Sequence, residues 1–102
     1  MIRCSRRKGS QEVRVSFVLP ADSSERALAV AGDFNGWDPV ETRFRKRGDE
    51  RVASVTVEAG RRYAFRYVGD GDRWFNDADA HGYEPNEYGE TNCVLDLTEN
   101  TP

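Results

Sequence analysis

An alternation of apolar and polar residues with a period of two constrains the fold of this chain more than any other feature of its sequence. It is clearest over residues 12–19, where the apolar positions include Val13, Val15, Phe17 and Leu19. Successive side chains of a β-strand point to opposite faces of the sheet, so this pattern predicts a strand with one buried face. Pro20 and the polar residues after it predict the end of that strand.

The same alternation recurs along most of the chain and predicts an all-β fold. Further strands are expected over residues 26–31, 42–46, 51–59, 62–68 and 92–97, and a hairpin turn at 69–72 leads into a short strand at 73–75. Residues 76–90 are polar and irregular, and the sequence nowhere sustains the spacing of a helix. About seven short strands separated by turn residues predict an immunoglobulin-like (early-set) antiparallel β-sandwich.

The length of 102 residues fits one domain, which can bury a core without help from a metal or a disulfide. We expect a flexible basic N-terminal tail over residues 1–10, the sandwich over 11–98 and a C-terminal tail over 99–102. The cations of the first tail are Arg3, Arg6, Arg7 and Lys8. An alternative interpretation is that they form an arm toward an anionic partner. The net charge of −3 argues against a general nucleic-acid-binding domain.

Several sequence signals of a secreted or membrane protein are missing. The chain has no run of the roughly 20 apolar residues that a membrane span needs, no apolar core of a secretion signal and no Asn-X-Ser/Thr sequon. Cys4 and Cys93 are too few for a disulfide framework. We therefore predict a cytoplasmic protein with reduced thiols that binds no membrane, although the two cysteines could pair if the chain ends met.

The sequence offers little for catalysis or metal binding. His81 is the only histidine and lies in a polar segment, where a solvated loop side chain is the common finding, so a nucleophile–histidine pair is not expected. Residues 77–82 start like a calcium loop but have His81 at its fifth position and Tyr88 at its twelfth, where acidic or amide ligands are needed. With 18 acidic residues, chance carboxylate pairs are unavoidable. We expect no catalytic residue, no metal and no cofactor.

The two tryptophans are the strongest candidates for binding residues. Trp37 lies in a loop rich in Gly, Asn and Asp, and Trp74 follows an Asp-Gly turn, so both stand apart from the apolar rows of the strands. An exposed indole ring can accept the apolar face of a pyranose, with hydrogen bonds to the hydroxyls around it. The alternative is that both rings merely cover the edges of the sandwich.

Four segments in order make the chain similar to a known family. They are residues 31–37 (AGDFNGW), residues 63–67 (YAFRY), the Asp70-Gly71 pair before Trp74, and the strand around Asn92. Together they resemble carbohydrate-binding module family 48, which includes N-terminal domains of isoamylase and glycogen-branching enzymes and the glycogen-binding domain of the AMP-activated protein kinase beta subunit. The resemblance covers residues 13–97 and implies a non-catalytic module that binds α-1,4-linked glucans such as glycogen, starch or maltooligosaccharides.

The resemblance also implies which side chains contact sugar. Trp37 and Trp74 match two tryptophans that clamp glucose units. Asn92 matches an asparagine that hydrogen-bonds sugar hydroxyls, and Tyr88 falls where the family places an apolar residue against the ring.

One position departs from the family, because Ala64 stands where the family has a lysine of the site. Arg66 lies two residues further on and therefore on the same face of the strand, so its long side chain is expected to substitute. The alternative function keeps the fold but docks on a protein partner, a glycogen-metabolising or kinase-like enzyme, without binding sugar. That function would tolerate buried tryptophans and predicts an exposed apolar patch or an open strand edge.

Overall fold

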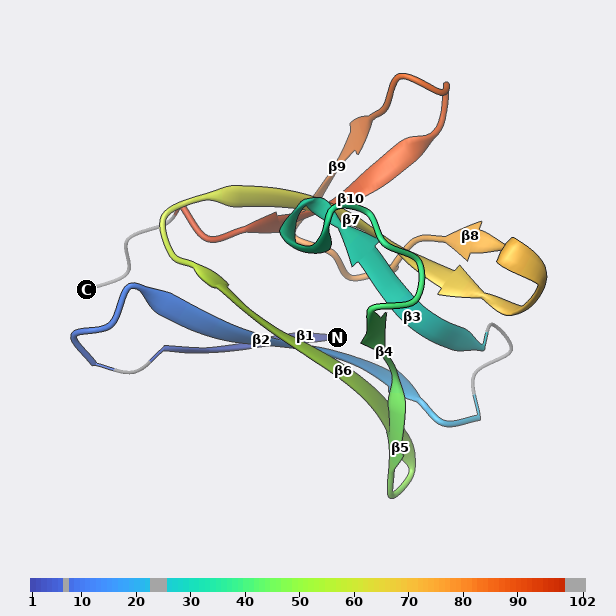
Figure 1. Cartoon of the computed structure of the whole chain (residues 1–102), viewed down its shortest axis with the longest axis horizontal. Coiled ribbons are helices and arrows are strands. Elements are labelled where there is room, and N and C mark those ends of the chain that lie inside the picture. The colour runs from blue at the N-terminus through green and yellow to red at the C-terminus, as the bar shows by residue number, and fades with distance from the viewer. Residues whose placement is uncertain (7, 23–25, 99–102) are drawn as a thin grey trace.

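Two antiparallel sheets pack face to face in the part of the chain that the structure, a computed structural model, describes, namely residues 1–6, 8–22 and 26–98 (Figure 1). Sheet A has the strand order β1 (Ile2–Arg6), β2 (Glu12–Pro20), β6 (Glu50–Glu58), β5 (Arg45–Arg47). Sheet B has the order β4 (Thr42–Arg43), β3 (Ala27–Gly32), β7 (Arg62–Gly69), β10 (Thr91–Asp96), β9 (Gly82–Pro85), and β8 (Trp74–Phe75) also pairs with β7. Two 3₁₀ turns, η1 (Asp33–Asn35) and η2 (Asp70–Asp72), connect strands.

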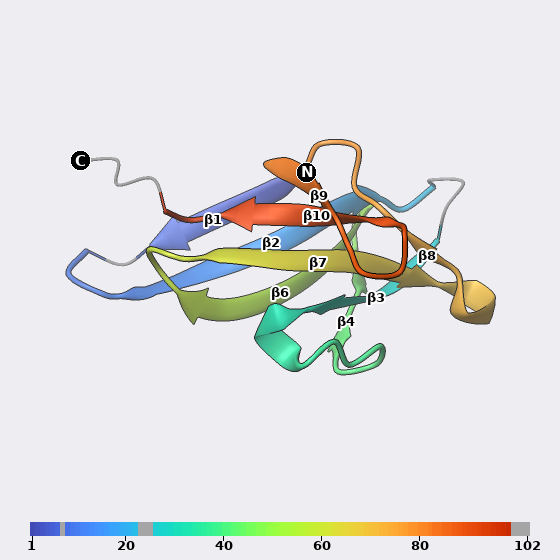
Figure 2. The same ribbon diagram turned by 90° about the horizontal axis from the view of Figure 1, so that it is seen from above.

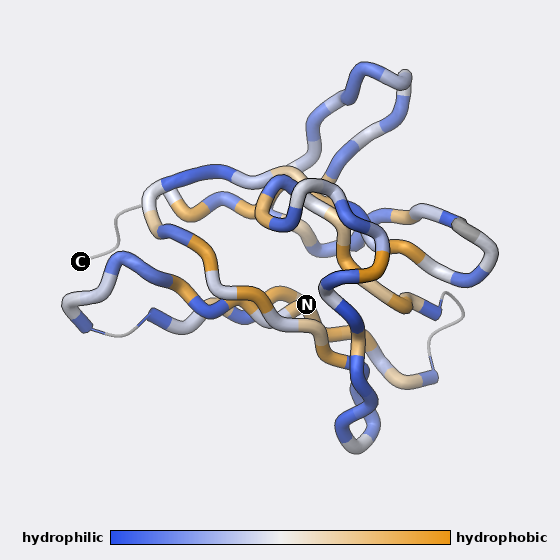
Figure 3. Tube along the Cα trace, in the orientation of Figure 1, coloured by the Kyte–Doolittle hydropathy of each residue, from blue (hydrophilic) through white to orange (hydrophobic). Residues whose placement is uncertain are grey.

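The predicted all-β sandwich is confirmed, and so is the alternation that predicts it. Val15, Phe17, Phe65, Tyr67, Cys93 and Leu95 are all completely shielded from solvent between the sheets. Tyr67 lies at the centre of the core, with its ring 5.5 Å from that of Phe44 and 5.6 Å from that of Phe75, measured between centroids. Apolar residues are concentrated along the strands that face the interior, while the hairpin tips are polar (Figure 3). Burial of these rings supplies the main driving force for folding.

The structure has more strands than the sequence predicts. Residues 42–46, expected to form one strand, divide into β4 and β5, which belong to different sheets. Phe44 lies between them with its side chain buried in the core, so the chain bends from one layer to the other at this residue. The hairpin at 69–72 is confirmed, because β7 pairs with β8 across η2.

Strand β1 replaces part of the tail predicted over residues 1–10. It pairs antiparallel with β2, from Ile2 opposite Phe17 to Arg6 opposite Val13. Its backbone satisfies hydrogen-bonding groups of β2 that would otherwise form an open edge, and Ile2 packs against the core. The prediction of a flexible tail is therefore wrong for these residues. The predicted C-terminal tail at 99–102 lies outside the described residues.

Strand β9 lies within the segment predicted to be irregular. It pairs with β10, from Gly82 opposite Val94 to Pro85 opposite Thr91, and the β9–β10 hairpin projects beyond the sandwich (Figure 1). Viewed from above, sheet B lies over the strands of sheet A (Figure 2).

Cys4 is exposed and Cys93 is buried, and both are free thiols, so the alternative that they pair is wrong. Over the described residues, no helix is long and apolar enough to cross a membrane.

Candidate functional site

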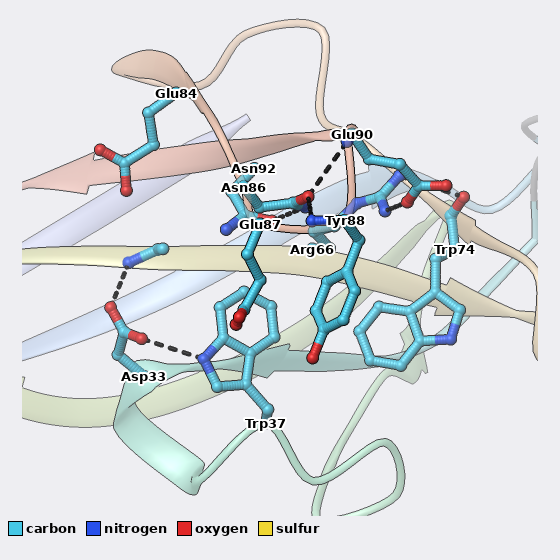
Figure 4. Close-up of a pocket in the computed structure, with 11 residues that line it drawn as sticks. Asp33, Trp37, Arg66, Trp74, Glu84, Asn86, Glu87, Tyr88, Glu90 and Asn92 are labelled. Atoms are coloured by element: carbon cyan, nitrogen blue, oxygen red, sulfur yellow. Dashed lines mark hydrogen bonds and ion pairs between the residues drawn. The ribbon is translucent and has the colours of Figure 1, made fainter.

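A cleft of about 850 Å³ lies on the outer face of sheet B, between the loop around η1, strands β7 and β8, and the β9–β10 hairpin (Figure 4). Its lining residues are Asp33, Trp37, Ala64, Arg66, Trp74, Glu84, Asn86, Glu87, Tyr88, Glu90 and Asn92. All five side chains that the sequence points to as binding residues are therefore in one cavity. They come from segments that are up to 55 residues apart in the chain (92 − 37).

Trp37 and Trp74 form the aromatic part of this cleft. Their ring centroids are 6.5 Å apart and their ring planes are inclined by only 24°. Both side chains are half-buried, so each keeps part of its surface open to solvent. The two nearly parallel rings form an apolar surface, and most of the other residues that line the cleft are polar or charged.

The loop of residues 32–38 holds Trp37 in place through the side chain of Asp33. One carboxylate oxygen of Asp33 accepts the indole N–H of Trp37 at 3.0 Å, and the other accepts the backbone N–H of Ala64 at 2.8 Å. The ring is thus tied to the backbone of β7. Phe34 anchors the same loop on the core, with its ring 5.9 Å from that of Phe17.

Asn35 closes the loop with four hydrogen bonds from one side chain. Its carbonyl oxygen accepts the backbone N–H groups of Gly32 and Asp38. Its amide nitrogen donates to the backbone carbonyl of Val30 and to the hydroxyl of buried Thr42. An amide side chain, which has both donors and acceptors, is required for this set.

Trp37 has a strained backbone conformation, with φ at 61°. This left-handed region costs an L-residue about 1–2 kcal/mol, and a bulky ring is seldom found there. The preceding Gly36 has φ at 67°, and the Trp37 N–H donates to the carbonyl of Gly32 at 2.9 Å. The conformation that turns the indole toward the cleft therefore lowers the stability of the fold. Such strain is concentrated at functional sites in folded proteins.

The guanidinium of Arg66 is occupied by the protein itself. Its Nε donates to Asn76 at 2.9 Å, one terminal nitrogen pairs with Glu90, and the other donates to the carbonyl of Trp74 at 3.4 Å. Only 13% of the side chain is exposed. Arg66 lines the cleft on the same face as Ala64, as expected, but its contacts connect β8 to the β9–β10 hairpin. It holds the two walls of the cleft together.

Tyr88 and Asn92 belong to the β9–β10 hairpin, and the side chain of Asn86 holds both of them in place. The Asn86 carbonyl oxygen accepts the backbone N–H groups of Tyr88 and Glu90, and its amide donates to Asn92 Oδ1 at 3.0 Å. Tyr88 is 81% exposed, and its ring extends from the turn toward the end of the cleft that holds the tryptophans (Figure 4). Gly89, with φ at 78°, completes the turn.

Sequence reasoning missed the residues that position the others. Asp33 lies inside the recognised loop motif, and its spacing of four from Trp37 was the available signal. Asn86 and Gly89 are turn residues, but β9 has only Tyr83 as a large apolar residue, so the hairpin lacks an alternating pattern. His81, discussed above, accepts the backbone N–H of Asp96 through Nδ1 at 3.0 Å and is exposed outside the cleft.

A buried polar network supports sheet B beneath this face. The hydroxyl of Tyr67 donates to Asp77, and the backbone N–H of Asp77 donates to the sulfur of Cys93 at 3.2 Å. Burial, followed by the hydrogen bond to Asp77, raises the pKa of Tyr67 well above its usual range. Burial likewise raises the pKa of the Cys93 thiol to about 11. Both groups are therefore neutral at physiological pH and serve as hydrogen-bonding parts of the core.

The cleft combines apolar aromatic surface with hydrogen-bonding groups. Aromatic rings are surrounded by amide and carboxylate groups, and no three His, Cys, Asp or Glu side chains of the described residues are placed to hold a metal ion. No protein-family model matches the chain, and a search of curated protein sequences gives no significant match.

Proposed function

We propose that this protein is a non-catalytic module that binds α-1,4-linked glucan chains in the cleft of sheet B. The observation that carries the proposal is the placement of Trp37 and Trp74 side by side, half-exposed, in one cavity with Asn92. Indole faces are among the few protein surfaces that bind sugars in water, because the C–H face of a pyranose is apolar. The resemblance of the sequence to carbohydrate-binding module family 48 supports the same ligand.

The proposed binding uses three kinds of contact. The rings of Trp37 and Trp74 stack on neighbouring glucose units, and Tyr88 covers them from the hairpin. The amide of Asn92 bonds sugar hydroxyls at the floor of the cleft. Arg66 acts by orienting Trp74 through its backbone carbonyl, since its guanidinium is already bonded to protein groups.

The expected affinity is low for one short chain. If each indole ring loses about 100 Å² to sugar, the pair contributes on the order of 5 kcal/mol at about 25 cal/mol/Å² before ordering costs. A Kd of about 1 mM corresponds to about −4 kcal/mol. Tight attachment then requires many chain ends on one particle, so the module works as a tether to a branched glucan.

A titration with maltoheptaose tests the proposal. We expect saturable changes in tryptophan fluorescence and in the amide spectra of residues 33–37 and 74, with a Kd near the millimolar range. Trp37→Ala and Trp74→Ala should each abolish the response while the fold persists. Val40→Ala, which removes an exposed apolar side chain outside the cleft, should leave it unchanged. A folded wild type that shows no response up to ~10 mM ligand would reject the function.

The alternative of a sugar-independent protein-docking domain has less support. The large apolar side chains that are exposed among the described residues are Met1, Val40, Tyr83 and Tyr88. Tyr88 lines the cleft, and Tyr83 donates its hydroxyl to the backbone carbonyl of Asp77. Both tryptophans lie in the cleft rather than in the core, as sugar binding requires.

A further inference from the structure

The charges that line the cleft are strongly unbalanced. Its carboxylates are those of Asp33, Glu84, Glu87 and Glu90, whereas Arg66 is its single cation. Arg66 is paired with Glu90, which leaves three carboxylates without a compensating cation among the residues of the cleft. The residues that line the cleft therefore have a net formal charge of −3 (1 − 4).

Two of these carboxylates are free to face a ligand. Glu84 lies on β9 directly opposite Asn92, and Glu87 lies in the turn beside Tyr88. Both side chains are exposed, and neither carboxylate has a hydrogen bond or an ion pair with the residues that the structure describes. Figure 4 shows the Glu87 side chain extending from the turn toward Trp37. Asp33 differs, since its oxygens already accept the N–H groups of Trp37 and Ala64.

We propose that Glu84 and Glu87 make the cleft select glucans by charge. It binds amino-substituted chains more tightly than neutral ones, and it binds chains that carry carboxylate or phosphate groups more weakly. This inference rests on the proposed glucan-binding function and names the chemical class of ligand that the same site accepts. A carboxylate on the sugar would lie next to these side chains without a cation to offset the repulsion, because the Arg66 guanidinium is committed to Asn76, Glu90 and Trp74.

The size of the effect follows from the exposure of the two side chains. Solvent weakens each interaction, so two carboxylates together change the affinity for a singly charged sugar unit by about tenfold at low salt. The effect is long-ranged and falls as ionic strength rises, because the Debye length shortens from ~30 Å at 0.01 M salt to ~8 Å at 0.15 M. Stacking on the tryptophans does not depend on salt in this way, which separates the two contributions.

Three maltoheptaose forms with one backbone test the inference. The first is maltoheptaose itself, the second has a carboxylate in place of one C6 hydroxymethyl group, and the third has an amino group at one C6. Titrations at low and at physiological salt should rank the affinities amino, neutral, carboxylate, with about tenfold steps at low salt that shrink as salt is added. The double variant Glu84→Gln, Glu87→Gln should bring the three affinities closer together.

A matched variant controls for total charge. Glu12 and Glu58 face each other across β2 and β6, away from the cleft, and the double variant Glu12→Gln, Glu58→Gln removes the same charge. This control variant should rank the affinities for the three ligands in the same order as the wild type. Equal affinities for all three ligands would overturn the charge selectivity and leave glucan binding intact. Binding of the amino form alone would support the selectivity and overturn the neutral glucan as ligand, and binding of none would overturn both.

Discussion

The carboxylate of Asp33 accepts the indole N–H of Trp37 at 3.0 Å and so fixes the ring on one side of the cleft. Removing this acceptor in Asp33→Ala should free the ring and also leave the Ala64 N–H without its partner, at a cost of about 1–3 kcal/mol in the free energy of unfolding. We expect glucan affinity to fall about tenfold, measured by fluorescence titration. Asp49→Ala, which removes a carboxylate from the β5–β6 turn, should change neither quantity; unchanged affinity in Asp33→Ala would show that Trp37 is held by other contacts.

The positive φ of Trp37 predicts an inverted order of stability between two truncations. Glycine normally destabilises a folded chain relative to alanine, but at a φ of 61° it avoids the left-handed strain. Trp37→Gly should therefore be more stable than Trp37→Ala by about 1 kcal/mol in chemical unfolding, although neither binds glucan. At Trp74, which lies in a strand, the usual order should hold. The same order at both positions would argue against strain at Trp37.

Two substitutions of Asn86 separate its two functions. Asn86→Asp keeps the oxygen that accepts the N–H groups of Tyr88 and Glu90, but it removes the donor to Asn92. Asn86→Ala removes both. Amide hydrogen exchange over residues 86–90 should stay slow in the first variant and become at least about tenfold faster in the second, because the turn loses its acceptor. Equal exchange in both would show that Gly89 and the strand ladder suffice to form the turn.

Arg66 should act on the cleft through stability and positioning. Arg66→Lys keeps the charge but cannot reach Asn76, Glu90 and the Trp74 carbonyl with a single ammonium. We expect a loss of about 1–3 kcal/mol in the free energy of unfolding, together with faster amide exchange in β8. Arg62→Lys is the control, since Arg62 is exposed on the same strand and makes a long ion pair with Asp96. A loss of affinity with no change in exchange would instead assign Arg66 a direct contact with the ligand.

Alkaline pH should destabilise the fold through Cys93 and Tyr67. Both keep their protons more firmly in the folded state than in the unfolded chain, where they titrate near 9.0 and 10.0. The stabilisation from Cys93 is thus complete below about pH 9.0 and is lost as pH rises toward its folded-state pKa of about 11, whereas the stabilisation from Tyr67 is lost as pH rises above 10.0. The expected slope is about 1.4 kcal/mol per pH unit for each group.

Denaturant unfolding at pH 8 to 11 measures that slope. Cys93→Ala should remove the loss of unfolding free energy that starts near pH 9.0. Cys4→Ser should have a smaller effect on this pH dependence, since Cys4 is exposed on β1. A free energy of unfolding that does not change over this range would show that the thiol and the phenol ionise as easily in the folded protein as in the unfolded chain.

The strands with a clear alternation were predictable because their burial depends on local pattern. Residues 12–19 and 62–68 have an apolar residue at every second position, and the core is built from those residues. Strands β1 and β9 could not be predicted in this way. Edge strands bury little apolar surface. Their pairing is therefore specified by the free backbone hydrogen-bonding groups of the neighbouring strand, which is β2 for β1 and β10 for β9.

Five residues of the cleft were predictable in identity, but their roles were predictable only in part. Trp37 and Trp74 stand out because aromatic residues in polar turns are unusual, and Asn92 and Tyr88 follow from the family resemblance. The position of Arg66 on the outer face follows from the strand period. Its bonds to Asn76 and Glu90 depend on how β8 and the hairpin are folded against β7, and no local pattern encodes that arrangement.

The passage of the chain from one sheet to the other at Phe44 has a mechanical consequence. Thr42–Arg43 is hydrogen-bonded into one layer and Arg45–Arg47 into the other, so a covalent strap one residue long joins the edges of the two sheets. Sliding of the two layers past each other would have to tear a ladder on one side of that strap and drag a buried ring through the interior. Under the proposed function, a pull on a glucan chain bound in the cleft would act on sheet B, and the strap would transmit it to sheet A through the backbone. The strap therefore braces the sandwich against sliding of one sheet past the other.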